Sequence, residues 1–171
     1  MLVMRFRLEH RIGVTPEACA RAFADPGLYP ELTDLPKLGG AEVVDHREDG
    51  DRVELRVRYR FTGELSSAAK AVIDPARLTW VDESVHDLAK RAVTYRMVAD
   101  HYADRFSCSG AYRFEPDGDG TVRITEGELK VRALLVGGAV EKAIVSGLDE
   151  HLTAEGPIVE QYVARKGWTR A

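Results

Sequence analysis

The sequence predicts an α+β protein in which a curved antiparallel sheet of about six to seven strands packs against one long C-terminal helix. Three observations predict this fold. The chain begins with a segment of strictly alternating apolar and polar residues, which is typical of a half-buried strand. Several further alternating segments follow, separated by turn sequences. The last ~30 residues instead repeat apolar side chains at steps of three and four, as an amphipathic helix does.

The first strand is predicted over Met4–Ile12, where apolar residues alternate with arginine and glutamate. Two short helices are expected after it. Thr15 followed by Pro16 is typical of a helix N-terminus, because threonine caps the first turn and proline fits its first position. The Asp-Pro-Gly sequence at residues 25–27 should end this helix. Residues 28–35 should form a second short helix or turn.

Strands dominate the middle of the chain. The segments with alternating apolar residues are 41–48, 52–62, 78–86, 92–99, 104–115 and 121–132. The turn sequences at 49–51 and 117–120 predict hairpins, so neighbouring strands should run antiparallel. Residues 65–73 are rich in alanine and predict a weakly helical connector.

The final helix is predicted over residues 136–165 and is long enough, at 1.5 Å per residue, to cross the open face of the sheet. Glu141 is expected in its first turn, where a carboxylate interacts favourably with the helix dipole. Gly137 and Gly138 should allow the backbone to approach the sheet closely, and an anion-binding cradle is the alternative interpretation. Because no repeat, low-complexity tract or linker interrupts the chain, residues 1–171 are expected to form one domain.

This order of elements resembles the helix-grip fold of the START and Bet v 1-like (SRPBCC, polyketide cyclase-like) superfamily. A more specific likeness lies in residues 127–142, Gly-Glu-Leu-Lys-Val-Arg-Ala-Leu-Leu-Val-Gly-Gly-Ala-Val-Glu-Lys. This segment is similar to the strand-to-helix junction of an uncharacterised bacterial branch of the superfamily, of unknown function, which often has proline where this chain has Leu134. The resemblance implies a ligand cavity between the sheet and the helix. It implies no particular catalytic residue, since no reaction is assigned to that branch.

Candidate ligand-binding residues are the large side chains in the inward phase of each segment, which form either plain core or the lining of a cavity. They are Phe6, Leu8, Val57, Tyr59, Phe61, Trp80, Tyr95, Met97, Cys108, Tyr112, Ile144 and Leu148. Trp80 shares its phase with Asp82, Ser84 and His86. This polar run predicts either a polar end of the cavity or the point at which the strand leaves the sheet.

Histidines and one glutamate are the weak candidates for acid–base chemistry. His10 lies in the apolar phase of the first strand, and His151 lies in the apolar stripe of the last helix, so both could face one interior. Each could equally be a hydrogen-bonded core histidine. His86 is a third candidate. Glu126 shares the phase of its apolar neighbours on the last strand and would then be buried, unless a bulge at Gly127 shifts the register.

Composition excludes several classes of function. The chain has Lys+Arg 24 and Asp+Glu 28, a net charge of -4 and no one-sided basic field, so we expect no nucleic-acid partner. No apolar run is long enough to span a bilayer and no signal sequence is evident, which predicts a cytoplasmic protein without integral membrane association. The histidine spacing predicts no metal site, and Cys19 and Cys108 are expected as reduced, apolar thiols.

The sequence contains no asparagine and a single glutamine, Gln161. Recognition inside the fold should therefore depend on His, Tyr, hydroxyl, carboxylate and backbone groups. The leading hypothesis is a cofactor-independent protein that binds an apolar, lipid-like or polyketide-like small molecule. One alternative is a cofactor-independent cyclase or dehydratase that uses cavity His, Tyr or Glu residues. Another is a protein-interaction module.

Overall fold

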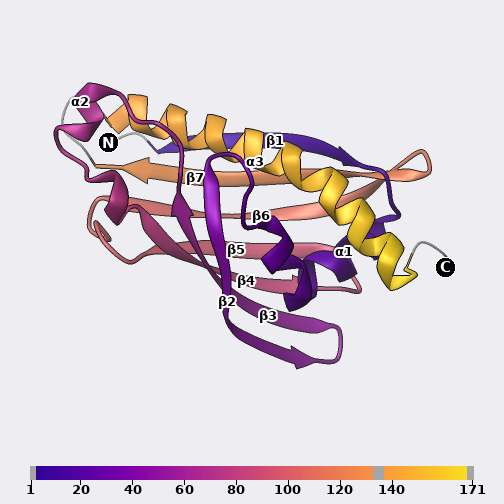
Figure 1. The fold of residues 1–171 in the computed structure, drawn as a ribbon. Helices are drawn as coiled ribbons and strands as arrows, with labels where there is room; N and C mark the ends of the chain where they lie inside the picture. Colours follow the sequence, from indigo (N-terminus) through magenta and orange to yellow (C-terminus); the bar gives the residue numbers. More distant parts are fainter. Residues whose placement is uncertain (1–2, 133–136, 169–171) are drawn as a thin grey trace.

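A curved antiparallel sheet of seven strands forms the body of the protein (Figure 1). The computed structural model describes residues 3–132 and 137–168. The strands are β1 (Met4–Ile12), β2 (Leu38–Asp49), β3 (Arg52–Phe61), β4 (Thr79–Asp87), β5 (Ala92–Ala99), β6 (Phe106–Asp117) and β7 (Gly120–Val131). Their order in the sheet is β1-β7-β6-β5-β4-β3-β2. Strands β2 to β7 thus pair with their neighbours in sequence, and β1 pairs with the last strand.

Two pairs of short helices connect the strands, and one long helix covers the sheet. Helices α1 (Pro16–Ala24) and η1 (Pro26–Leu32) follow β1, while α2 (Ser67–Lys70) and η2 (Pro75–Arg77) lie between β3 and β4. The long helix α3 (Gly137–Lys166) crosses the concave face of the sheet (Figure 1). The predicted helix-grip architecture is therefore confirmed. Within the described ranges, no helix combines the length and apolar character needed to cross a membrane.

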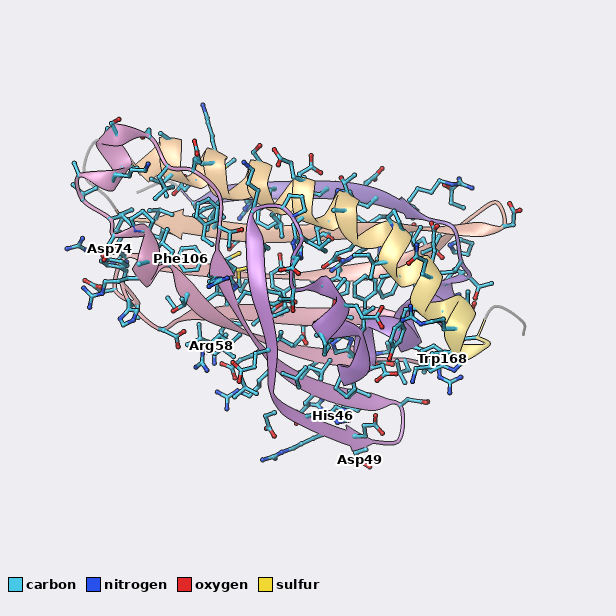
Figure 2. All side chains as sticks on the ribbon, in the orientation of Figure 1. His46, Asp49, Arg58, Asp74, Phe106 and Trp168 are labelled. Carbon is cyan, nitrogen blue, oxygen red and sulfur yellow. The ribbon has the colours of Figure 1, made fainter. Side chains whose placement is uncertain are left out.

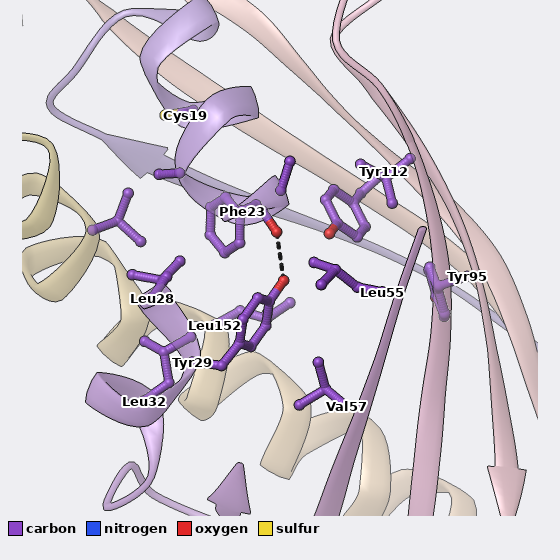
Figure 3. Close-up of a cluster of buried hydrophobic side chains, with 14 of the residues drawn as sticks. Cys19, Phe23, Leu28, Tyr29, Leu32, Leu55, Val57, Tyr95, Tyr112 and Leu152 are labelled. Atoms are coloured by element: carbon purple, nitrogen blue, oxygen red, sulfur yellow. Dashed lines mark hydrogen bonds between the residues drawn. The ribbon is translucent and has the colours of Figure 1, made fainter. Parts of the chain in front are cut away.

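Of the two helices after β1, α1 begins and ends as its sequence predicts. The Thr15 hydroxyl accepts a hydrogen bond from the Ala18 N–H at 3.3 Å, which caps α1. The second helix begins earlier than expected and is a 3-10 helix with Pro30 inside it. Its Tyr29 hydroxyl donates to the Phe23 carbonyl at 2.6 Å (Figure 3). This bond ties η1 to the end of α1.

A large part of the core lies where α1 and η1 pack between the sheet and α3. Figure 3 shows Phe23, Leu28 and Leu32 of these helices facing Leu55 on β3 and Leu152 on α3. Phe23 stacks on Phe114 of β6 with ring centroids 5.4 Å apart. The opposite end of the sheet lies beside α2 and the N-terminal half of α3 (Figure 1). Helices α1 and η1 therefore do not fill the space between the sheet and α3 at the α2 end.

Two expectations for the last strand and its junction with α3 are wrong. No bulge occurs at Gly127, because the pairing of β1 with β7 runs without interruption from Met4↔Leu129 to Ile12↔Thr121. Glu141 lies beyond the first turn of α3, and its Oε1 accepts the Val131 N–H of β7 at 3.0 Å. Residues 133–136, which include Leu134 and the predicted helix start, lie outside the described residues.

Glycine at position 127 is required by the side chains that pack over it. A Cβ atom there would lie 2.5 Å from both the Tyr95 hydroxyl oxygen and Cζ of Phe6. Gly138 in the first turn of α3 has nothing within 4 Å of the equivalent position. The two glycines thus form a matched pair for testing how tightly the sheet is packed.

We expect Gly127→Ala to lower the free energy of unfolding by about 1–3 kcal/mol, because Tyr95 and Phe6 must move. Gly138→Ala should leave it unchanged or raise it by up to ~1 kcal/mol, since alanine favours helix. Urea unfolding of the two variants and the wild type measures both values. Equal effects at the two positions would contradict this packing.

Candidate ligand-binding site

Two adjacent cavities lie between the sheet and α3, and they share four wall residues: Leu38, Trp80, Met97 and Leu148. The first, called here the outer cavity, has a volume of about 60 Å³ and lies at the α2 end of the sheet. Phe106, one of its wall residues, lies at that end, opposite the end that carries Trp168 (Figure 2). The second, called here the inner cavity, has a volume of about 50 Å³ and lies toward α1 and η1, which supply Phe23 and Tyr29 to its wall.

The wall of the outer cavity is almost entirely apolar. Apart from the four shared residues, it consists of Phe6, Phe61, Leu78, Thr79, Ala99, His101, Tyr102, Phe106, Cys108, Leu129, Ile144 and Val145. His101 is exposed and lies at the rim. Cys108 is buried and unpaired, and burial raises the pKa of its thiol to about 12, so it behaves as a small apolar side chain.

The wall of the inner cavity is polar and aromatic instead. Apart from the shared residues, it consists of Phe23, Tyr29, Tyr59, Asp82, Tyr95, Tyr112, Arg123, Thr125, His151, Leu152 and Glu155. The polar groups come from three directions: Asp82 from β4, Arg123 and Thr125 from β7, and His151 and Glu155 from α3. The two cavities together thus run from an apolar end to a polar end.

A buried ion pair crosses the inner cavity from the sheet to the helix. Arg123 Nη1 donates to Glu155 Oε2 at 2.7 Å, and His151 Nε2 lies 3.0 Å from Glu155 Oε1. Burial alone would raise the pKa of Glu155, but Arg123 and His151 bring it below its ordinary value. Burial would lower the pKa of Arg123, and Glu155 raises it above its ordinary value. Both partners are therefore charged.

The Arg123 guanidinium also lies against two aromatic rings. Its Cζ atom is 4.0 Å from the ring centroid of Tyr112 and 4.4 Å from that of Phe23. Contacts of this kind are attractive, and more so where water is excluded. Arg123 is thus held by one carboxylate and two rings.

Four polar atoms in the inner cavity are buried without a hydrogen-bond partner among the described residues. They are Asp82 Oδ1, Arg123 Nε, Thr125 Oγ1 and His151 Nδ1. Buried polar atoms usually have partners, because leaving one unpaired costs about 1–3 kcal/mol. All four residues line the inner cavity, so a polar group of a bound molecule would lie near these unpaired atoms.

Asp82 is the carboxyl of this group whose protonation is most affected by the fold. Burial, opposed by the nearby charge of Arg123, raises its pKa from 3.8 to about 7. At neutral pH the carboxyl is therefore present in both its protonated and its ionised form. It is able to donate as well as accept a hydrogen bond.

Most of the ligand-binding residues predicted from the sequence line one cavity or both. Those in the outer cavity alone are Phe6, Phe61, Cys108 and Ile144; those in the inner cavity alone are Tyr59, Tyr95 and Tyr112; those in both are Trp80, Met97 and Leu148. Leu8 and Val57 line neither cavity. Val57 is buried in the core near Tyr29 (Figure 3), and Leu8 packs against that core from the edge strand β1.

Of the predicted acid–base histidines, His151 alone lies in the inner cavity. His10 is buried elsewhere, with its Nε2 2.7 Å from Asp149 Oδ1 on α3. His86 is buried with its Nε2 2.9 Å from Ser84 Oγ, and burial together with the charge of Arg123 lowers its pKa to about 3. Strand β4 stays in the sheet to Asp87, and of Asp82, Ser84 and His86 only Asp82 lines either of the two cavities between the sheet and α3.

Glu126 is not an interior acid, because the phase assigned to the last strand is wrong. The residues of β7 that face the interior include Thr121, Arg123, Thr125 and Leu129, so Glu126 points outward and hydrogen-bonds with Arg7. Its backbone carbonyl accepts the Tyr95 hydroxyl at 3.2 Å.

Sequence reasoning missed three polar residues of the inner cavity, Arg123, Thr125 and Glu155, and four apolar or aromatic ones, Phe23, Tyr29, Leu38 and Leu152. Counting back from Leu129 in steps of two, without a bulge, would have placed Thr125 and Arg123 inside. Glu155 lies four residues after His151, on the same face of α3. The available signal was a charged residue among inward-facing positions: Arg123 in the phase of Leu129 on β7, and Glu155 on the face of α3 that carries His151.

A curved seven-stranded sheet closed over a long C-terminal helix, with cavities between the two, defines the class of proteins with the helix-grip fold. Within this class the chain belongs to the family described as "Protein of unknown function (DUF2505)", whose model matches residues 7–163. No curated protein matches the chain.

Solved structures with a similar fold share little sequence with this chain. The Zhui aromatase/cyclase from Streptomyces sp. R1128 has a TM-score of 0.66 and 16% identity, with 99% of this chain and 98% of that one covered. TTHA0849 from Thermus thermophilus has a TM-score of 0.64 and 18% identity, and the match covers 95% of this chain and 99% of that one. Norcoclaurine synthase from Thalictrum flavum has a TM-score of 0.62 and 18% identity, and the match covers 95% of this chain and 87% of that one. At these identities the likeness establishes the fold alone.

We expect the stability of the wild type to fall, relative to Asp82→Asn, as the pH rises from about 4 to 7. In this window the native protein keeps a proton on Asp82 that the unfolded chain has released, so raising the pH favours unfolding. Asparagine does not ionise and removes this dependence. His86, whose pKa is lowered, acts in the opposite direction but equally in both proteins. Thermal unfolding at several pH values measures the difference, and parallel curves would contradict the raised pKa.

Proposed function

We propose that the protein binds an apolar small molecule between the sheet and α3, with the apolar part in the outer cavity and a polar atom in the inner cavity. The observation that carries this proposal is the pair of cavities that share Leu38, Trp80, Met97 and Leu148, one walled by apolar groups and the other by unpartnered polar atoms. Binding sites for small molecules commonly combine apolar walls with a few such polar groups. We place this function in the cytoplasm, in one domain without a cofactor.

The size of the cavities sets a condition on binding. A dry cavity of about 150 Å³ accepts benzene. Cavities of about 60 and 50 Å³ are smaller, so the walls must move before a lipid-like or polyketide-like molecule enters. Met97 lies between the two cavities and has a flexible, unbranched side chain. Rotation of Met97 would join them into one continuous site.

An enzyme of the cyclase or dehydratase type is the second candidate. The observation that favours it is Asp82, a carboxyl with a pKa of about 7 in the cavity that also holds His151 and Tyr95. A group that is half protonated at the working pH suits acid–base catalysis. Two of the proteins with this fold are also enzymes by name, an aromatase/cyclase and a synthase.

The interaction-module hypothesis gains less support. In the part of the chain that the structure describes, the strongly exposed large apolar side chains are Val3, Val44, Val72 and Val98. They belong to four separate segments. Single exposed apolar residues of this kind are normal on a protein surface.

Filling the outer cavity should weaken ligand binding. Ala99 lies in its wall on β5, and Ala99→Leu adds three carbon atoms there. We expect the wild type to bind the probe 4-propylphenol, with NMR shifts at the cavity residues, and Ala99→Leu to bind it at least tenfold more weakly. Ala92→Leu, on the opposite face of the same strand, is the control and should bind as the wild type does.

Two results would contradict the proposed function. One is a wild type whose spectrum does not change with 4-propylphenol up to its solubility limit. The other is an Ala99→Leu variant that remains folded and binds the probe as tightly as the wild type.

A further inference from the structure

The inner cavity has a charge balance that discriminates between polar groups. We infer that it selects a neutral hydroxyl group on its ligand and rejects a carboxylate. This inference rests on the proposed function, since it concerns the polar end of the same site. It goes further by assigning the ligand to the class of apolar alcohols and phenols, as distinct from fatty or aromatic acids.

The one strong cation in the wall is already neutralised. Among the described residues that line the inner cavity, Arg123 is the only arginine or lysine, and Glu155 holds it at 2.7 Å. The remaining carboxyl, Asp82, adds negative charge when it ionises. An entering carboxylate would therefore meet two carboxyl groups and only one cation. In a site shielded from water this repulsion is strong.

Recruiting Arg123 for an anionic ligand would require Glu155 to release it. Glu155 is 4% exposed, so the released carboxylate would stay buried and would keep only its contact with His151. Breaking a buried pair in this way is strongly unfavourable, because one charge loses its compensation. The Arg123–Glu155 pair thus makes the binding of a carboxylate ligand unfavourable.

The unpartnered atoms match the hydrogen-bonding capacity of a hydroxyl. Arg123 Nε is a donor only, Asp82 Oδ1 is an acceptor when ionised, and Thr125 Oγ1 is both. A hydroxyl donates one hydrogen bond and accepts others, so it is able to satisfy an acceptor and a donor at once. A purely apolar molecule would leave all of these atoms unpaired, at a cost in affinity.

The aromatic walls favour a flat ring next to that hydroxyl. Tyr59 and Trp80 stack with their ring centroids 6.2 Å apart, and Tyr95 and Tyr112 lie at the same separation on neighbouring strands. Ring faces and edges of this kind pack well against another aromatic ring. A phenol with an apolar substituent therefore has the shape and the polar group that the site offers.

Three probes of similar size test the inference: 4-propylphenol, propylbenzene and 4-propylbenzoate, titrated by NMR at pH 8. We expect the phenol to bind about three- to tenfold more tightly than propylbenzene, the gain of one net hydrogen bond. The benzoate should bind more weakly than either. If the benzoate binds as tightly as the phenol, or propylbenzene does, the inference is overturned while the proposed function stands. If no probe binds, both fail.

Two threonines of β7 provide a matched pair of variants. Thr125→Val removes the unpartnered hydroxyl from the inner cavity and should reduce the preference for the phenol over propylbenzene about threefold or more. Thr121 is also buried on the same strand, but its hydroxyl donates to the Val14 carbonyl at 2.6 Å, outside the cavity. Thr121→Val should lower stability and keep the preference. An unchanged preference in Thr125→Val would contradict the assignment of its hydroxyl.

Glu155→Gln should reverse the selectivity, because it leaves the charge of Arg123 uncompensated. We expect this variant to bind 4-propylbenzoate at least tenfold more tightly than the wild type does. If it folds and still rejects the benzoate, the charge-balance argument is wrong. If it fails to fold, the three probes with the wild type and Thr125→Val still decide the question.

Discussion

The ion pair between Arg123 and Glu155 is the interaction on which the polar half of the interior depends. It joins β7 to α3 in a region where both side chains are almost fully buried. Each charge would be very unfavourable there without the other. The pair consequently fixes which face of α3 meets the sheet, and that face also carries His151 and Leu148 toward the cavities.

The same pair separates two kinds of packing along the helix. Beyond Glu155, toward its C-terminus, α3 packs on α1 and η1, and the space is filled by side chains such as Val159 and Val163. Toward its N-terminus, the sheet and α3 enclose the two cavities. A curved sheet and one helix do not fill the volume between them. Helices α1 and η1 fill it at one end, and the α2 end keeps space for a ligand.

Local sequence signals predicted the elements of this fold well. Alternation, turn sequences and the Thr15-Pro16 cap depend on neighbouring residues only, so they are visible in the chain itself. The inward-facing residues of β7 were assigned wrongly because they depend on how β7 pairs with β6 and with β1. Strand β1 lies at the other end of the sequence, so this pairing is not visible in the local pattern. Arg123 was therefore not recognised as an interior residue. A cavity between the sheet and the helix was implied by the resemblance, but its size and its division in two could not be predicted, since they depend on how side chains from most of the strands pack.

The absence of asparagine from the sequence anticipated the chemistry of the inner cavity. With no asparagine available, its polar wall consists of tyrosines, Thr125, His151 and two carboxyl groups, together with the arginine that was not foreseen. Asp82 is protonated in part at neutral pH and then has the donor and acceptor of a neutral group, much as an amide would. The charge of the cavity is thus set by one ion pair and one titrating carboxyl.

A double-mutant cycle on Arg123→Met and Glu155→Gln, followed by urea unfolding, tests most directly whether this pair organises the interior. Each single variant should lower the free energy of unfolding by about 3–5 kcal/mol, because it leaves one buried charge unpaired. The double variant should lose at least ~2 kcal/mol less than the sum of the two, since neither unpaired charge remains. Losses that add within ~0.5 kcal/mol would show that the two residues act independently, and would contradict the account.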